Sequence, residues 1–141
     1  MTQYLLDTNV ISETTRPQPH TGVLSFIAGL PAILIPAVGL YELASGVERL
    51  AAGKRRSFLE KWLAELLAAE CEVIPLDQKA ALVAASLEAE TRRRGRPIDT
   101  RDLLILATAK ARELGVATRN VEHFRGFGVP LYDPFEDHHG R

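Results

Sequence analysis

Four oxygen-bearing side chains lie far apart in the chain, at Asp7, Glu42, Asp102 and Asn120. Each falls where an apolar strand is expected to end or an apolar helix to begin. In an open parallel α/β sheet, the carboxyl ends of the strands meet at one crevice, which is where ligands bind. Carboxylates gathered there repel one another unless a cation lies between them, and carboxylate oxygens suit Mg²⁺ or Mn²⁺. The pattern therefore predicts a metal-dependent enzyme that acts on phosphate.

Each of the three acids also has a simpler structural interpretation. Asp7 could cap a short helix over residues 9–13. Glu42 lies among small residues, but Arg49, seven residues further on, could be its ion-pair partner. Asp102 falls in the first turn of a predicted helix, where an acid interacts favourably with the helix dipole. From the sequence alone, both interpretations of each acid stay open.

The fourth signal follows the last but one of the predicted strands. Asn120 offers a neutral oxygen, and Thr118 a hydroxyl, and both groups can lie near a metal ion or its waters. His123, three residues further on, is more typical of a packed or surface histidine than of a metal ligand. This segment therefore adds oxygen atoms to the predicted crevice but no further carboxylate at Asn120.

The elements that must position these residues alternate between strand-like and helical patterns, which indicates an α/β fold with a parallel sheet. Short apolar runs predict five strands, at residues 3–6, 32–36, 71–76, 116–118 and 129–132. Helical periodicity and capping residues predict helices at residues 21–30, 38–52 and 57–70, from the Asp77 cap to about residue 94, and at 99–114. Gly115 is expected to end the last helix. Pro17 and Pro19 indicate a rigid turn.

Length and composition bound the class of protein. The 141 residues fit one domain, which we place at residues 1–135, followed by a polar tail at 136–141. The lone Cys71 cannot form an internal disulfide, which fits a reducing cytosol. The first residues lack a secretory pattern, and the longest apolar stretch, 103–109, is far shorter than the roughly 20 residues of a membrane span. We therefore expect a cytoplasmic protein without a membrane contact.

Charge limits how the protein could meet nucleic acid. Because the formal net charge is −1, no overall positive field would attract a polyanion to the whole surface. Any contact with nucleic acid must come from local basic residues, and Arg101, Arg119 and Arg125 are the candidates nearest the predicted crevice. Basic residues in such positions are also typical of solvated helix ends.

Taken in order, the motifs resemble those of PIN-domain ribonucleases of the VapC or FitB-like type. They are Leu-Leu-Asp-Thr-Asn at Asp7, Tyr-Glu-Leu-Ala-Ser-Gly at Glu42, Arg-Asp-Leu-Leu-Ile-Leu-Ala at Asp102 and Ala-Thr-Arg-Asn at Asn120. The resemblance extends from residue 3 to Pro134. Each motif alone is weak, but four in this order and at these spacings are specific.

The resemblance implies a three-layer α/β/α fold and an endoribonuclease that depends on Mg²⁺ or Mn²⁺. It places Asp7, Glu42 and Asp102 at the three principal acids and Asn120 at a fourth, more variable catalytic position. It also implies a toxin of a toxin–antitoxin pair, which forms a homodimer and is held inactive by a cognate antitoxin.

The chain departs from the family pattern at two places. Pro36 and Gly39 stand where relatives often have serine and threonine ahead of the glutamate, and His123 stands where an aspartate is common. Because Asn120 is neutral as well, three residues remain alternatives for completing the site: Asn120, Glu122 and His123. The number of metal ions, one or two, also stays open.

Two rival functions remain. The chain could act chiefly as a partner-binding module, because an apolar stripe between Phe58 and Leu67 exceeds what a short helix needs for its own core. It could also be a phosphatase with Asp7 as the nucleophile. Such enzymes usually carry a second acid two residues later, where this chain has Asn9.

Overall fold

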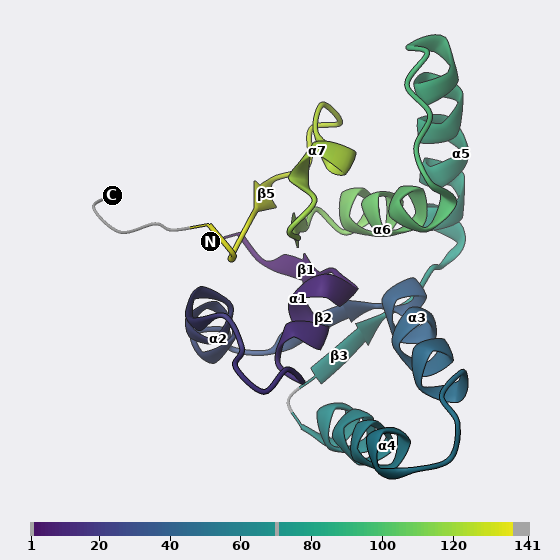
Figure 1. The fold of residues 1–141 in the computed structure, drawn as a ribbon. Helices are drawn as coiled ribbons and strands as arrows, with labels where there is room; N and C mark the ends of the chain where they lie inside the picture. Colours follow the sequence, from purple (N-terminus) through teal and green to yellow (C-terminus); the bar gives the residue numbers. More distant parts are fainter. Residues whose placement is uncertain (1, 70, 137–141) are drawn as a thin grey trace.

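The computed structural model describes residues 2–69 and 71–136, in which strands and helices alternate along most of the chain (Figure 1). The strands are β1 (Tyr4–Leu6), β2 (Ile33–Pro36), β3 (Cys71–Ile74), β4 (Gly115–Ala117) and β5 (Leu131–Tyr132). The helices are α1 (Thr8–Glu13), α2 (Thr21–Ala28), α3 (Ala37–Glu48), α4 (Lys54–Ala68), α5 (Gln78–Arg93), α6 (Thr100–Ala111) and α7 (Val121–Phe124). Of the predicted polar tail at 136–141, only Glu136 lies within the described residues.

All five strands pair in parallel, in the order β3-β2-β1-β4-β5. Successive residues of a strand point to opposite sides of the sheet, and nearly all residues of these strands are apolar. The sheet is therefore apolar on both faces. Leu5 and Leu34 belong to the core on one face, whereas Leu6 and Ile35 belong to the core on the other. The predicted parallel sheet of about five strands is therefore confirmed.

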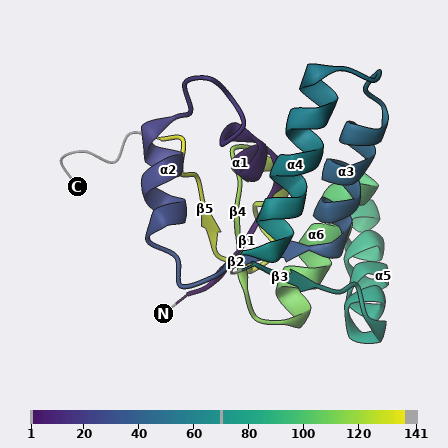
Figure 2. The same ribbon diagram turned by 90° about the horizontal axis from the view of Figure 1, so that it is seen from below.

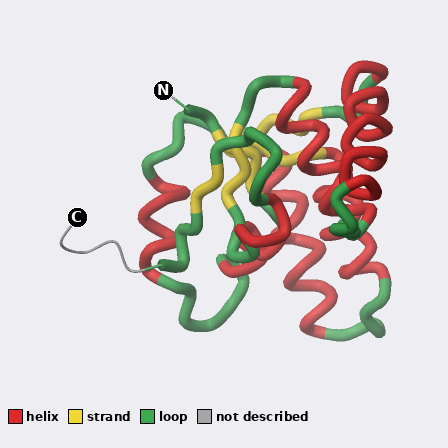
Figure 3. The backbone as a smooth tube through the Cα atoms, turned by 90° about the horizontal axis from the view of Figure 1, so that it is seen from above, coloured by secondary structure: helices red, strands yellow, loops and turns green. Residues whose placement is uncertain are grey.

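Helices cover both faces and form the outer layers (Figures 2 and 3). One core contains apolar residues of α1, α2 and α4, and the other contains those of α5, α6 and α7. Helix α3 packs against α1, α4 and α6, so it links the two layers at one edge of the sheet. This arrangement brings α3 beside the end of β1 and the start of α6.

Helix boundaries differ from the sequence prediction at several ends. Helix α1 corresponds to the short helix over residues 9–13 that was one of the two interpretations of Asp7, whereas α7 was not predicted, because a segment of four residues carries too little periodicity. Helix α4 begins at Lys54 rather than at residue 57. The prediction that Gly115 ends the preceding helix is wrong: α6 ends at Ala111, Glu113 takes a left-handed φ of 56°, and Gly115 opens β4.

Several local predictions are confirmed. Asp77 caps α5 by accepting a hydrogen bond from the backbone N–H of Ala80 at 3.0 Å. Pro75 follows directly on β3, which lies at the edge of the sheet, as a proline without a backbone donor should. Helix α6 is the most buried of the described helices, yet none of these helices has the length and apolar character that crossing a bilayer requires.

Candidate active site

Strand β1 is central in the sheet. The chain first adds β2 and β3 on one side of β1 and then crosses over to add β4 and β5 on the other side. In parallel α/β sheets such a change of side leaves a crevice at the carboxyl ends of the strands where it occurs, here β1 and β4. Asp7 follows β1 directly, and its backbone N–H donates to the carbonyl of Ala117 in β4 at 2.9 Å. The topology therefore places Asp7 at the mouth of this crevice.

The Asp7 side chain is 6% exposed and held on both oxygens. One oxygen accepts the backbone N–H of Thr8 at 2.8 Å and so caps α1. The other accepts the hydroxyl of Thr118 at 2.8 Å, across 111 residues of sequence. The helix-cap interpretation of Asp7 is therefore confirmed, and it is compatible with a role in ligand binding because a carboxylate has further lone pairs.

Glu42 projects from α3 toward the same crevice, and its side chain is 15% exposed. Its partner is the guanidinium of Arg101, which precedes Asp102 on α6. Arg49 instead donates to the hydroxyl of Ser45 at 2.9 Å. The interpretation of Glu42 as an ordinary pair with Arg49 is therefore wrong.

Asp102 lies in the first turn of α6, whose N-cap is Asp99, as the structural interpretation of this acid predicts. Its side chain is 20% exposed, and its carboxylate lies 2.9 Å from Nδ1 of His123. Because His123 belongs to α7, this contact ties the helix after β4 to the start of α6. Asp102 therefore faces the crevice rather than open solvent.

The charges of neighbouring acids affect the ionisation of Asp7 and Glu42. The pKa of Asp7 is raised, mainly by burial and in smaller part by the charge of Asp102, against hydrogen bonds from Thr118 and Thr8. The pKa of Glu42 is also raised, mainly by burial, and the charges of Asp7 and Asp102 add to the effect. Arg101 opposes it. A cluster of acids that resists full ionisation is typical of a site that binds a cation or a proton.

The three alternatives for a fourth position differ in where they point. Asn120 is exposed, and its backbone N–H donates to the Thr118 hydroxyl at 3.0 Å. Glu122 pairs with Arg125 at 2.7 Å. His123 is the alternative whose side chain contacts one of the three acids. The structure therefore brings Asp7, Glu42 and Asp102 together, with His123 rather than the Asn120 side chain beside them.

The donor set suits a divalent cation, because three carboxylates supply the oxygen ligands that Mg²⁺ and Mn²⁺ prefer. Within residues 2–69 and 71–136, however, no three His, Cys, Asp or Glu side chains are gathered closely enough to hold a metal ion. Two of the three acids have side-chain partners, since Glu42 pairs with Arg101 and Asp102 contacts His123. The residues fit the metal in chemistry, and the charge of Arg101 on Glu42 opposes its binding.

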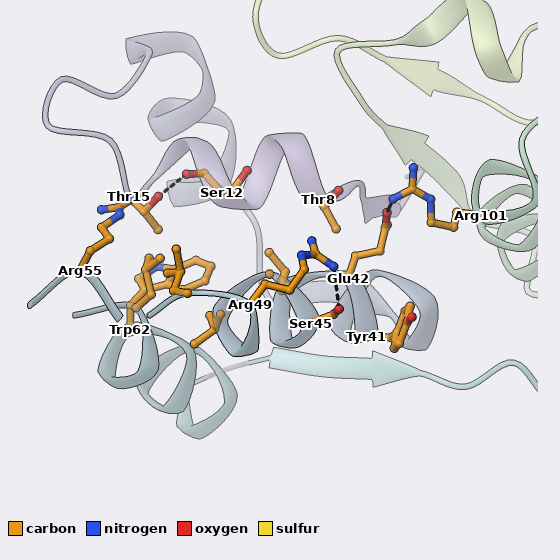
Figure 4. Close-up of a pocket in the computed structure, with 15 residues that line it drawn as sticks. Thr8, Ser12, Thr15, Tyr41, Glu42, Ser45, Arg49, Arg55, Trp62 and Arg101 are labelled. Atoms are coloured by element: carbon orange, nitrogen blue, oxygen red, sulfur yellow. Dashed lines mark hydrogen bonds and ion pairs between the residues drawn. The ribbon is translucent and has the colours of Figure 1, made fainter. Parts of the chain in front are cut away.

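A groove of about 560 Å³ leads away from Glu42 between α1 on one side and α3 and α4 on the other (Figure 4). Thr8 and Ser12 line its α1 side, and Trp62 and Arg55 lie toward its far end. Arg101 reaches Glu42 at the near end. The groove joins the acidic crevice to the surface of α4.

The other two predicted RNA contacts are both exposed. The guanidinium of Arg119 stacks over the Phe135 ring at 4.4 Å, and its backbone N–H donates to Asn9 at 3.2 Å. Arg125 is engaged by Glu122. Within the described part of the chain, neither arginine forms a hydrogen bond or ion pair with the three acids, so their role in binding RNA stays a prediction.

Arg96 is a structural residue of the site that sequence reasoning missed. Its guanidinium donates to the backbone carbonyls of Glu122 and Arg125, both at 2.6 Å, and lies 5.4 Å from the centre of the Phe127 ring. These bonds hold α7, and with it His123, against the rest of the molecule. Nothing in the run Arg92-Arg93-Arg94-Gly95-Arg96 distinguishes Arg96 from its neighbours.

Comparison with known proteins agrees with this geometry. The family model of the PIN domain matches residues 4–127, which include all three acids. The chain belongs to the PIN-domain family. The resemblance stated from the sequence motifs is confirmed, and so is the predicted three-layer architecture.

Relatives of this PIN domain are similar over nearly their whole length. Toxin FitB of Neisseria gonorrhoeae is 34% identical over 137 residues, which cover 94% of this chain and 99% of FitB. VapC ribonuclease Y4jK of Sinorhizobium fredii is 35% identical over 136 residues, which cover 94% of this chain and 97% of that protein. A crystal structure of FitAcB from Neisseria gonorrhoeae superimposes with a TM-score of 0.86 at 33% identity, covering 96% of this chain and 100% of that one.

Proposed function

We propose that this PIN domain is a divalent-metal-dependent endoribonuclease that hydrolyses RNA phosphodiester bonds as the toxin of a toxin–antitoxin pair. The observation that carries the proposal is that Asp7, Glu42 and Asp102 face the same β1/β4 crevice. The charges of neighbouring acids there contribute to the raised pKa values of Asp7 and Glu42. The names of two relatives, a toxin and a ribonuclease, support the reaction and the biological role.

In this proposal Asp7, Glu42 and Asp102 hold Mg²⁺ or Mn²⁺, as one ion or two. Such an ion would supply polarisation of the scissile phosphate and a bound water of lowered pKa. Thr118 and Thr8 favour the ionised form of Asp7, because their hydrogen bonds lower its pKa against the effect of burial. His123 orients Asp102 from outside the ligand set, as partners of metal-binding carboxylates commonly do.

Substrate binding needs positive charge from the protein. Three carboxylates around one divalent ion leave a net negative charge, which would repel a phosphodiester. Arg101 pairs with Glu42 at the crevice, and Arg119 and Arg125 are exposed on the segment after β4; all three would contact the RNA backbone through charge-assisted hydrogen bonds. Because these contacts read phosphate rather than bases, we expect recognition to depend on RNA shape.

A toxin of this kind needs a partner that restrains it in the cytoplasm. The groove between α1, α3 and α4 opens beside Glu42, so a segment of an antitoxin bound there would lie next to the acids. Helix α4 has no buried residue, and Phe58 and Leu67 are 52% and 43% exposed, which leaves an apolar face for an antitoxin or a second copy of the chain. We therefore include a cognate antitoxin and a homodimer in the proposal.

The decisive experiment is RNA cleavage by the purified protein without its partner, with Mg²⁺ or Mn²⁺ and with EDTA. Cleavage should stop in EDTA and return when the metal is restored. Glu42→Gln should lower the rate by about a hundredfold or more, the usual cost of removing a member of a catalytic set. Glu48→Gln, on the same helix but at an exposed acid, is the matched control and should cleave at the parent rate.

Two outcomes would contradict the proposal. Cleavage that persists in EDTA would show that the reaction does not need a metal ion. A Glu42→Gln protein as active as the parent would show that Glu42 does not belong to the active site. Binding of a partner without any cleavage would favour the partner-binding module, and a trapped phosphoaspartate on Asp7 would favour the phosphatase.

A further inference from the structure

Arg101 holds an unusual position for a residue beside a cation site. Its guanidinium pairs with Glu42 across 59 residues of sequence, and its Nε also lies 3.3 Å from Asp99. Its backbone N–H donates to the same Asp99 carboxylate at 3.1 Å. The side chain is 60% exposed, so it contacts the acids from the solvent side and is not locked by packing.

The guanidinium of Arg101 opposes a divalent cation at Glu42. Arginine stays protonated in proteins, so its positive charge cannot be lost when a second cation arrives. Two positive groups on one carboxylate repel each other at short range, where screening by salt is weak. A cation bound through Glu42 therefore binds less tightly while Arg101 stays on the carboxylate.

Displacement of Arg101 does not require the fold to change. Asp99 is already within reach of the arginine and remains as a partner when Glu42 is withdrawn. Glu42 lies on α3 and Arg101 on α6, and these helices pack together, so a change of side-chain conformation is enough to separate the pair. Arg49, also on α3, is bound to Ser45 and takes no part in this exchange.

We propose that Arg101 acts as an internal competitor for the divalent cation at Glu42, so that this one side chain sets how tightly the site binds metal. The inference rests on the proposed function, because it assumes that Glu42 is a metal ligand. Arg101 is thus a positioning residue, which acts on the metal through Glu42. The ion pair competes with a cation for the Glu42 carboxylate.

The test is the affinity for Mn²⁺, measured by isothermal titration calorimetry on the full chain in the absence of RNA. Arg101→Gln should bind Mn²⁺ about three- to tenfold more tightly than the parent, the range expected when a partly exposed ion pair and its charge repulsion are removed. Arg49→Gln removes the same charge from the same groove without touching an acid, and its affinity should change by less than about twofold.

The controls separate the two proposals. If Asp7→Asn loses Mn²⁺ binding while Arg101→Gln binds no more tightly than the parent, the metal site stands and the competitor role is overturned. If Arg49→Gln gains as much affinity as Arg101→Gln, a general field rather than the Glu42 pair is responsible, and the inference also fails. If neither the parent nor Arg101→Gln binds Mn²⁺, this result contradicts both the proposed metal site and the competitor role of Arg101.

Discussion

Asp7 combines structural and proposed chemical roles in one buried side chain, and its ionisation has a cost for folding. Burial is the main cause of its raised pKa, so the folded protein binds the proton more tightly than the unfolded chain does. The sign follows from linkage: the favourable contribution is complete below the pKa of Asp7 in the unfolded chain, near 3.8, and is lost as pH rises through the pKa in the folded protein. At neutral pH the charged Asp7 therefore lowers stability.

We predict that Asp7→Asn abolishes cleavage and, in buffer with EDTA, stabilises the fold at pH 7 by about 1 kcal/mol, as relief at functional sites commonly does. The gain should shrink as pH falls through the folded pKa of Asp7, because the folded protein then binds the proton and the buried charge disappears. Thermal unfolding of parent and variant across this pH range measures the difference.

Asp77 provides a control of opposite sign. Its pKa is lowered, mainly by the hydrogen bond from the Ala80 backbone at the start of α5, so its charge favours folding above the unfolded pKa. Asp77→Asn should gain no stability at pH 7. A loss of stability in Asp7→Asn at neutral pH would show that the hydrogen bonds of its carboxylate outweigh the burial of its charge.

The pairings of the acids could not be predicted residue by residue. The motifs and the expected ends of strands pointed to Asp7, Glu42 and Asp102, and all three meet at the crevice. Arg101 was expected to contact RNA, but its pairing with Glu42 joins residues that no sequence period relates. The placement of His123 beside Asp102 depends in the same way on contacts that Arg96 makes with the backbone of α7.

At the scale of elements, β4 shows why local pattern alone was insufficient. Its first residue, Gly115, looked like a helix stop, but it lies where the strand passes closest to its neighbours. A Cβ atom there would come within 2.6 Å of the Tyr4 ring and 2.8 Å of the Pro130 carbonyl oxygen. Long periodic helices and apolar strands were predictable, whereas short α1 and α7 depend on tertiary hydrogen bonds.

We predict that Gly115→Ala destabilises the protein by about 1–3 kcal/mol, the usual cost of overpacking a core. Gly46→Ala is the matched control, because a Cβ on that glycine of α3 meets nothing within 4 Å. That variant should gain about 0.5–1 kcal/mol, since alanine is the better residue inside a helix. Chemical unfolding of both variants measures the effect, and equal stability of the two would contradict the packing argument.

At the scale of the whole molecule, the described structure leaves apolar side chains on two separate surfaces. Phe58 of α4 is 52% exposed, and Leu82 of α5 is 64% exposed. Exposed patches of this kind commonly mark association surfaces. The two faces lie on different helical layers, so a partner and a second copy of the chain could each use one.

We predict that Phe58→Glu weakens self-association at least about tenfold, the effect of placing a charge in an apolar interface. Because the side chain is exposed in the single chain, unfolding should change by no more than about 0.5 kcal/mol. Sedimentation equilibrium of the parent, Phe58→Glu and Leu82→Glu measures the association, and chemical unfolding of the same proteins measures their stability. A parent that stays monomeric would rule out the homodimer, and loss of association in Leu82→Glu alone would assign the interface to α5.

The bond between Asp7 and Thr118 has a consequence for synthesis on the ribosome. Because 111 residues separate these partners, the first acid emerges from the exit tunnel long before the hydroxyl that holds it. Strand β1 likewise waits for β4, its neighbour in the middle of the sheet. A nascent chain therefore cannot assemble this centre until translation is almost complete.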